Sequence, residues 1–281
     1  MDFSNKLHQQ TEELLIFCNE NSKKYPDDDI RADFFGMLYD HLNNYYKGYL
    51  TAELARNFQN KNLLASPEFS QANAHHLKAF IEIDTVKLFN TSFISNLNRR
   101  FIIDTWSTFE LSINLVAVAV LDKATIDSLL DFETRDILEI LKKDKFEPIL
   151  SLEKLKKRFD RESLTHIPIN RKYHKILESI KNCYKRNAKA DEEFLIFYGK
   201  LRNTMHFNFI YYGKDYDYTF KGNLFKFRDG KITLYQNKFD PATDLYFSLF
   251  NEIKEIFYNI TCCINPANPI LYPDTGIYWD Q

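Results

Sequence analysis

Arg202, Asn203 and His206 stand close together in the stretch Leu201-Arg-Asn-Thr-Met-His206 and bring together a base and a permanent cation. If this stretch is helical, Arg202 and His206 lie one turn apart on the same face, with Cβ atoms about 5–6 Å apart. Histidine titrates near neutral pH and can accept a proton, whereas a guanidinium can bind two phosphate oxygens. Cleavage of RNA needs both, because a ribose hydroxyl loses a proton while negative charge builds on a phosphate. The spacing therefore predicts a pair suited to RNA cleavage.

Polar residues also interrupt the segment 94–121, whose nearly continuous apolar content predicts a central, largely buried helix. They are Asp104, Ser107, Glu110 and Asn114. At about 100° per residue, the last three fall within about 60° of one another and form a stripe. A buried carboxylate needs a cation as its partner. We therefore predict that a basic side chain faces Glu110, and that the stripe serves the structure more than the chemistry.

The helices that must position these residues follow from the hydrophobic periodicity. It predicts helices over residues 4–24, 30–60, about 66–89, 94–121, 168–189 and 191–206, with shorter charged helical pieces between 125 and 165. Asp191 is a candidate N-cap. After His206 the pattern changes to short aromatic and β-branched runs over 207–212, 216–221, 224–228 and 232–236, with hairpin turns at Gly222-Asn223 and Asp229-Gly230. A final helix is predicted over about 241–262.

The predicted fold class is mainly α: a helical bundle with a small antiparallel β-meander, at about 207–236, inserted before the last helix. The composition agrees, because 25 Phe and 17 Tyr accompany only 7 Gly and 8 Pro, so bulky side chains are many and helix breakers few. We expect an N-terminal helical extension over 1–90, a helical domain with the meander over 91–265, and a Pro-rich tail over 266–281. A chain of 281 residues can bury a sizeable core.

Charge and cysteine usage restrict the class of protein. The formal net charge of −2 gives no global attraction to nucleic acid, so an RNA substrate must be argued from a local site. The 4 cysteines form no C-x-x-C pair and indicate free thiols in a reducing cytoplasm. The first residues lack a secretory pattern, and the longest apolar run, Leu115–Leu121, is far shorter than the ~18 residues of a membrane span. We therefore expect a soluble cytoplasmic protein without a membrane partner.

The stretch Leu201-Arg-Asn-Thr-Met-His206 at the end of a late helix, together with the acidic residues of the earlier apolar helix, resembles the HEPN superfamily over roughly residues 92–265. Members of this superfamily are α-helical, and many are metal-independent endoribonucleases of toxin and phage-defence systems. The family motif places an Arg, followed by a polar residue such as Asn, a few residues before a His. Arg202, Asn203 and His206 take these roles here, at a spacing shorter than is common in the family. Glu110 matches the family's acidic position best and Asp104 second.

The resemblance implies a defence or toxin effector that cleaves RNA without a metal or other cofactor. In this scheme His206 is the general base, Arg202 binds the phosphate, Asn203 bonds the phosphate or fixes the imidazole, and Glu110 holds Arg202. One histidine cannot easily be both base and leaving-group acid in the same step. The resemblance therefore implies a homodimer in which two Arg/His sets face one cleft. An antitoxin or a sensor protein is a further expected kind of partner.

Other interpretations stay open. Arg202 and His206 can instead stabilise a catalytically silent helical module that binds a partner protein or a nucleotide. A metal-dependent hydrolase is disfavoured, because no His, Asp and Glu cluster has ligand spacing and the adjacent His75 and His76 cannot share a helix face. The basic run 154–158 is more often a solvated face than an RNA guide, and the tyrosines between 211 and 218 more often form core than a stacking surface.

Overall fold

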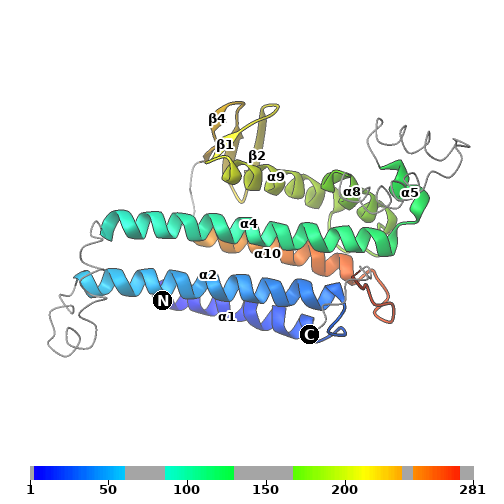
Figure 1. Ribbon diagram of the computed structural model, residues 1–281, viewed down its shortest axis with the longest axis horizontal. Coiled ribbons are helices and arrows are strands. Elements are labelled where there is room, and N and C mark those ends of the chain that lie inside the picture. The colour runs from blue at the N-terminus through cyan, green and yellow to red at the C-terminus, as the bar shows by residue number, and fades with distance from the viewer. Residues whose placement is uncertain (1–2, 61–85, 130–166, 236–242, 273–281) are drawn as a thin grey trace, which may run out of the picture. The chain divides into compact units, whose positions relative to one another are not determined.

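The computed structural model describes residues 3–60, 86–129, 167–235 and 243–272, and these are mainly α-helical (Figure 1). The helices are α1 (Phe3–Ser22), α2 (Ile30–Asn60), α4 (Val86–Val120), α5 (Lys123–Ser128), α8 (Ile169–Ser179), α9 (Ala188–His206) and α10 (Thr243–Thr261). The strands between α9 and α10 are β1 (Ile210–Tyr211), β2 (Tyr216–Phe220), β3 (Asn223–Phe227), β4 (Lys231–Ile232) and β5 (Leu234–Tyr235). The predicted class is therefore confirmed. The predicted helix over about 66–89 lies outside the described residues as far as residue 85, and its last residues belong to α4, which begins at Val86 rather than at 94. The helical pieces predicted between 125 and 165 lie outside the described residues from residue 130 onward.

The chain divides into two compact units, each made of three separate stretches of sequence. The first unit contains residues 1–20, 35–105 and 202–251, and the second contains residues 21–34, 106–201 and 252–281. The predicted boundaries near residues 90 and 265 stay predictions. Arg202, Asn203, His206 and Asp104 belong to the first unit, whereas Ser107, Glu110 and Asn114 belong to the second.

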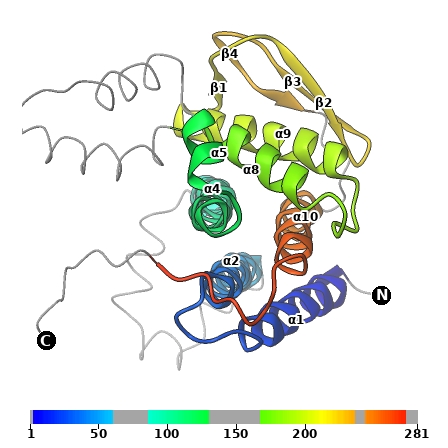
Figure 2. The same ribbon diagram turned by 90° about the vertical axis from the view of Figure 1, so that its right-hand side faces the viewer.

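An aromatic cluster joins the helices of the first unit. Tyr45 of α2 stacks on Phe101 of α4, with ring centroids 4.3 Å apart, and Phe101 stacks on Phe250 of α10 at 5.4 Å. The Tyr45 hydroxyl donates to Oδ1 of Asn98 at 2.8 Å, so its polar end has a partner inside the helix pair. Tyr45 and Phe101 are 2% and 4% exposed. The aromatic richness of residues 30–60 is therefore used to pack α2 against α4, which lie side by side in both views (Figures 1 and 2).

The strands of the first unit form a two-stranded sheet and a three-stranded sheet (Figure 2), and their pairing is not that of a simple meander. β2 and β3 pair around the two-residue turn Lys221-Gly222, where φ is positive at both residues, as a type I′ hairpin turn requires. This turn lies one residue earlier than predicted. β3 then pairs with β5, and β1 with β4. The N–H of Gly230 donates to the carbonyl of Tyr211 at 2.8 Å, which brings β4 to β1 rather than to β3.

The second unit has its own aromatic core. Trp106 of α4 stacks on Tyr198 of α9 with centroids 5.4 Å apart, and Phe34 stacks on Phe257 of α10 at 3.7 Å. Gly199 lets the indole approach α9, since a Cβ at this position would lie 3.1 Å from the Trp106 ring. Trp106, Phe34 and Phe257 are almost fully buried.

The start of α9 differs from the prediction. The helix begins at Ala188, and Oδ1 of Asn187 accepts the N–H of Ala190 at 3.1 Å, so Asn187 rather than Asp191 caps it. Asp191 is 5% exposed and accepts hydrogen bonds from the Tyr184 hydroxyl at 2.6 Å and from two nitrogens of Arg186 at 2.8 and 2.9 Å. Asp191 therefore anchors the loop before α9. The helix before this loop, α8, ends at Ser179 rather than near residue 189 as predicted.

The long helix α4 is apolar enough over Phe93–Val120 to span a membrane by length and composition, and it is the one such helix among the described residues. However, 56% of its most apolar window is buried inside the protein. Core helices that are mostly buried pass the same test of length and composition, so α4 is weak evidence for a membrane span.

Candidate functional site

The predicted Arg/His pair lies in the last turn of α9. Arg202 is half-buried, whereas Asn203 and His206 are exposed. Nη1 of Arg202 donates to the side-chain oxygen of Asn203 at 3.1 Å. The side-chain oxygen of Asn203 therefore contacts the guanidinium, and its expected bond to a phosphate or to the imidazole stays a prediction. The imidazole of His206 reaches solvent, as a base acting on a bound substrate must.

The backbone fixes where the helix ends and where His206 stands. The N–H of Phe209 donates to the carbonyl of Thr204 at 2.6 Å, a bond typical of a helix end that closes through left-handed residues. Asn208 and Phe209 supply that conformation, with φ of 53° and 68°. The carbonyl of Phe209 in turn accepts the N–H of Thr233 at 2.9 Å. A bulky residue rarely adopts positive φ, and such strain is held in place by its surroundings. The turn after His206 is thus tied to the strand layer.

Exposed aromatic side chains follow His206 directly. Phe207 is 57% exposed and Tyr212 is 62% exposed, and their rings meet edge to face with centroids 5.6 Å apart. Of the tyrosines between 211 and 218, only Tyr212 is exposed, because Tyr211 is buried and the other two are half-buried. Covering exposed apolar surface with a ligand is favourable, because it removes that surface from water. The pair of Phe207 and Tyr212 therefore forms a surface suited to flat apolar ligands.

The polar stripe of α4 faces a lysine in the second unit. Nζ of Lys172 on α8 donates to Oδ1 of Asn114 at 2.7 Å, and Glu110 acts electrostatically on the same ammonium group. Lys172 is 2% exposed, and Asn114 and Glu110 are half-buried, whereas Ser107 is exposed. The prediction that a basic residue faces Glu110 is thus met by Lys172. The pairing of Glu110 with Arg202 joins residues of different units and stays a prediction.

Burial lowers the pKa of Lys172 to about 8, and Glu110 raises it only in part. Between pH 8 and the ordinary value of 10.5, the unfolded chain holds this proton and the folded chain does not. The contribution of Lys172 to the free energy of unfolding therefore rises with pH between these two values. We expect wild-type stability to increase relative to Lys172→Met by about 1–3 kcal/mol over this pH range, as measured by urea unfolding. Lys175→Met, which removes an exposed ion pair with Glu178, is the matched control. If the free energy of unfolding changed with pH in the same way in wild type and in Lys172→Met, the lowered pKa of Lys172 would be wrong.

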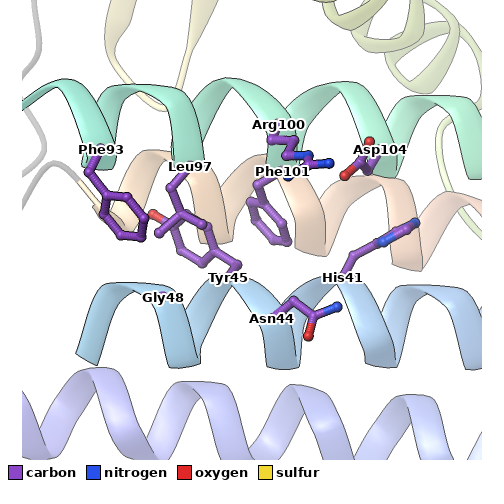
Figure 3. Close-up of a pocket in the computed structure, with 9 residues that line it drawn as sticks. All are labelled: His41, Asn44, Tyr45, Gly48, Phe93, Leu97, Arg100, Phe101 and Asp104. Carbon is purple, nitrogen blue, oxygen red and sulfur yellow. The ribbon is translucent and has the colours of Figure 1, made fainter. Parts of the chain in front are cut away.

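Asp104, the second candidate for the acidic position, lies elsewhere in the first unit. It lines a pocket between α2 and α4 together with His41 and Arg100 (Figure 3). His41 and Arg100 were not predicted as site residues from the sequence. Arg100 and Asp104 are spaced i, i+4 on a predicted helix, which was a usable signal, but His41 lies on a different helix and no local pattern links it to them.

Comparison of the chain with family models, with curated proteins and with solved structures finds no match.

Proposed function

We propose that the protein is a metal-independent endoribonuclease of HEPN type that acts in the cytoplasm as a defence or toxin effector. The observation that carries the proposal is the solvent-exposed imidazole of His206, one helical turn after Arg202, whose guanidinium is bonded to Asn203. A base that must meet a polymer has to be reachable from solvent. A cation that stabilises a phosphate has to be oriented, and a hydrogen bond to a neighbouring side chain restricts its movement.

In the proposed reaction, His206 accepts the proton of a ribose 2′-hydroxyl, and the 2′ oxygen attacks the adjacent phosphorus. The bond from phosphorus to the 5′ oxygen breaks, leaving a 2′,3′-cyclic phosphate on one fragment and a 5′-hydroxyl on the other. Arg202 stabilises the negative charge on the phosphate oxygens during the attack. The departing 5′ oxygen needs a proton. We assign this to the His206 of a second copy, so a homodimer is part of the proposal, and an antitoxin or sensor protein is a further proposed partner.

The rings next to His206 support a single-stranded substrate. Stacking of a base on an aromatic side chain contributes about 1–3 kcal/mol and tolerates any base. Phe207 and Tyr212, both largely exposed, offer such a surface within a few residues of the proposed base. A nucleotide stacked there would hold the neighbouring ribose near the imidazole. Tyr212→Ala should therefore raise KM for RNA several-fold without a matching loss of kcat, whereas Tyr212→Phe, which keeps the ring, should retain the wild-type KM.

The proposal is tested with labelled RNA in the presence of EDTA. The full chain should cut RNA and leave the DNA of the same sequence intact, since DNA has no 2′-hydroxyl to attack. A DNA strand with one ribonucleotide should be cut only after that ribonucleotide, and mass spectrometry should find the cyclic phosphate there. Equal cutting of RNA and DNA, or no cutting by protein shown to be folded by circular dichroism, would reject the assignment.

A further inference from the structure

α2 and α4 enclose a pocket of about 460 Å³ within the first unit (Figure 3). Sites for small molecules typically have volumes of about 300–1,000 Å³. The pocket has two chemically different ends. Phe93 and Leu97 of α4 lie at one end, and Arg100 and Asp104 of α4 lie at the other, with His41 of α2 extending toward Asp104 (Figure 3).

The apolar end depends on close packing of the two helices. A Cβ at Gly48 of α2 would lie 2.9 Å from the Leu97 side chain, so this position leaves room only for glycine unless Leu97 moves. Phe93 and Leu97 are half-buried, and the buried rings of Tyr45 and Phe101 complete the wall. An apolar group placed here would be removed from water on several sides.

At the charged end, Arg100 and Asp104 place opposite charges one helical turn apart on α4. Arg100 is exposed and makes no ion pair with any residue that the structure describes. Asp104 is half-buried, and its titratable neighbour is His41. Burial lowers the pKa of His41 below its ordinary value, although Asp104 and Asp40 act in the opposite direction. Burial therefore favours the neutral form of the His41 imidazole, which extends toward Asp104 (Figure 3).

We infer that this pocket binds a zwitterion whose ammonium and carboxylate groups lie on one carbon and which carries a large apolar group, the chemistry of an aromatic or branched-chain α-amino acid. The Arg100 fork matches a carboxylate, and Asp104 can accept hydrogen bonds from an ammonium group. The helix between Arg100 and Phe93 spans roughly 10 Å, which is long enough for such a side chain. A ligand with only one charge would partly cover the other protein charge without pairing it, at a cost in free energy. The site is independent of the proposed ribonuclease activity.

Titration calorimetry on the full chain tests the inference with L-phenylalanine and two analogues of the same ring. Phenethylamine lacks the carboxylate, and 3-phenylpropanoate lacks the ammonium group. We expect L-phenylalanine to bind at least about 10-fold more tightly than either analogue, because each analogue loses one charge-assisted contact. L-leucine should bind within about 10-fold of L-phenylalanine, since both have a large apolar side chain.

Variants locate the site. Arg100→Met and Asp104→Asn should each weaken L-phenylalanine binding about 10-fold or more, whereas Arg99→Met, a charge loss at the neighbouring position of α4 outside the pocket, should leave it unchanged. Thermal unfolding without ligand checks that each variant is folded. Equal binding of all three phenyl compounds, binding insensitive to Arg100→Met, or no binding of either amino acid by folded wild-type protein would overturn the inference.

Discussion

Replacement of His206 by alanine is expected to lower the rate of RNA cleavage by about 10²–10⁴-fold, the usual effect of losing a general base. The imidazole is exposed, so its loss should change the free energy of unfolding by less than about 0.5 kcal/mol. A large loss of cleavage rate with an unchanged free energy of unfolding would show that His206 acts in catalysis rather than in folding. Initial rates with labelled RNA in EDTA and urea unfolding of the same preparations measure them.

The neighbouring residues should rank behind His206 in a definite order. Arg202→Lys keeps the charge but loses the planar fork, so it should retain more activity than Arg202→Met. Asn203→Ala removes only the side-chain oxygen that bonds the guanidinium and should cost least. His174→Ala is the matched control, because His174 is also an exposed histidine at the surface of a helix. Cleavage by His206→Ala at the wild-type rate would end the ribonuclease proposal and favour a silent binding module.

The helices were predictable where periodicity and breakers agree. The bounds of α2 were predicted correctly, and those of α1 and α10 within about two residues, because apolar and aromatic positions recur there at helical spacing. The start of α9 was not predicted correctly, since the helix begins at Ala188 rather than at Asp191. Asp191 has the right chemistry for a cap, but Tyr184 and Arg186 compete for its carboxylate, and that contact depends on how the preceding loop folds. Capping preferences act locally and give way to such tertiary contacts.

Strand pairing also depends on contacts between distant residues, which local sequence preferences do not specify. The runs of β-branched and aromatic residues indicated where strands lie, and Gly222 indicated a hairpin turn. They did not indicate that β1 would pair with β4, since that pairing depends on backbone bonds between Tyr211 and Gly230. Each short strand carries too few side chains to specify its neighbour by alternation alone.

The candidate site was predictable in its residues but not in its environment. Spacing alone placed Arg202 and His206 on one helix face, because i and i+4 positions are neighbours in any helix. The left-handed turn that follows His206, by contrast, was not predictable, because asparagine adopts positive φ readily but a phenylalanine such as Phe209 rarely does. The cation facing Glu110 was expected from the cost of burying a carboxylate, yet the sequence offered no means of choosing Lys172.

Replacement of Arg31 by methionine is expected to lower the free energy of unfolding by about 3–5 kcal/mol, as when one partner of a buried ion pair is removed. Arg31 and Asp29 are both 0% exposed, and the guanidinium donates to Asp29 at 2.6 to 3.1 Å. It also donates to the carbonyl of Asn268 at 2.9 Å and lies over the Tyr25 ring at 4.4 Å. Methionine would fill much of the volume but leave the Asp29 carboxylate buried without its cation. Urea unfolding at pH 7 measures the loss.

The ion pair of Asp29 and Arg31 should also make the free energy of unfolding depend on pH. Burial raises the pKa of Asp29, but the hydrogen bonds and charge of Arg31 outweigh it, so the pKa lies below the ordinary value of 3.8. A carboxyl with a lowered pKa stabilises the fold above its unfolded pKa, and this stability is lost as pH falls through the folded value. In Arg31→Met the pKa of Asp29 should rise, so acid unfolding should begin at a higher pH than in wild type. The double variant Asp29→Asn/Arg31→Met removes the stranded charge and should recover part of the stability. Lys175→Met is the matched control, because it removes an exposed ion pair and should lower the free energy of unfolding by less than about 1 kcal/mol. A loss as small as this in Arg31→Met would show that the hydrogen bonds from Arg31 and Asp29 to residues 265–270 contribute little to stability.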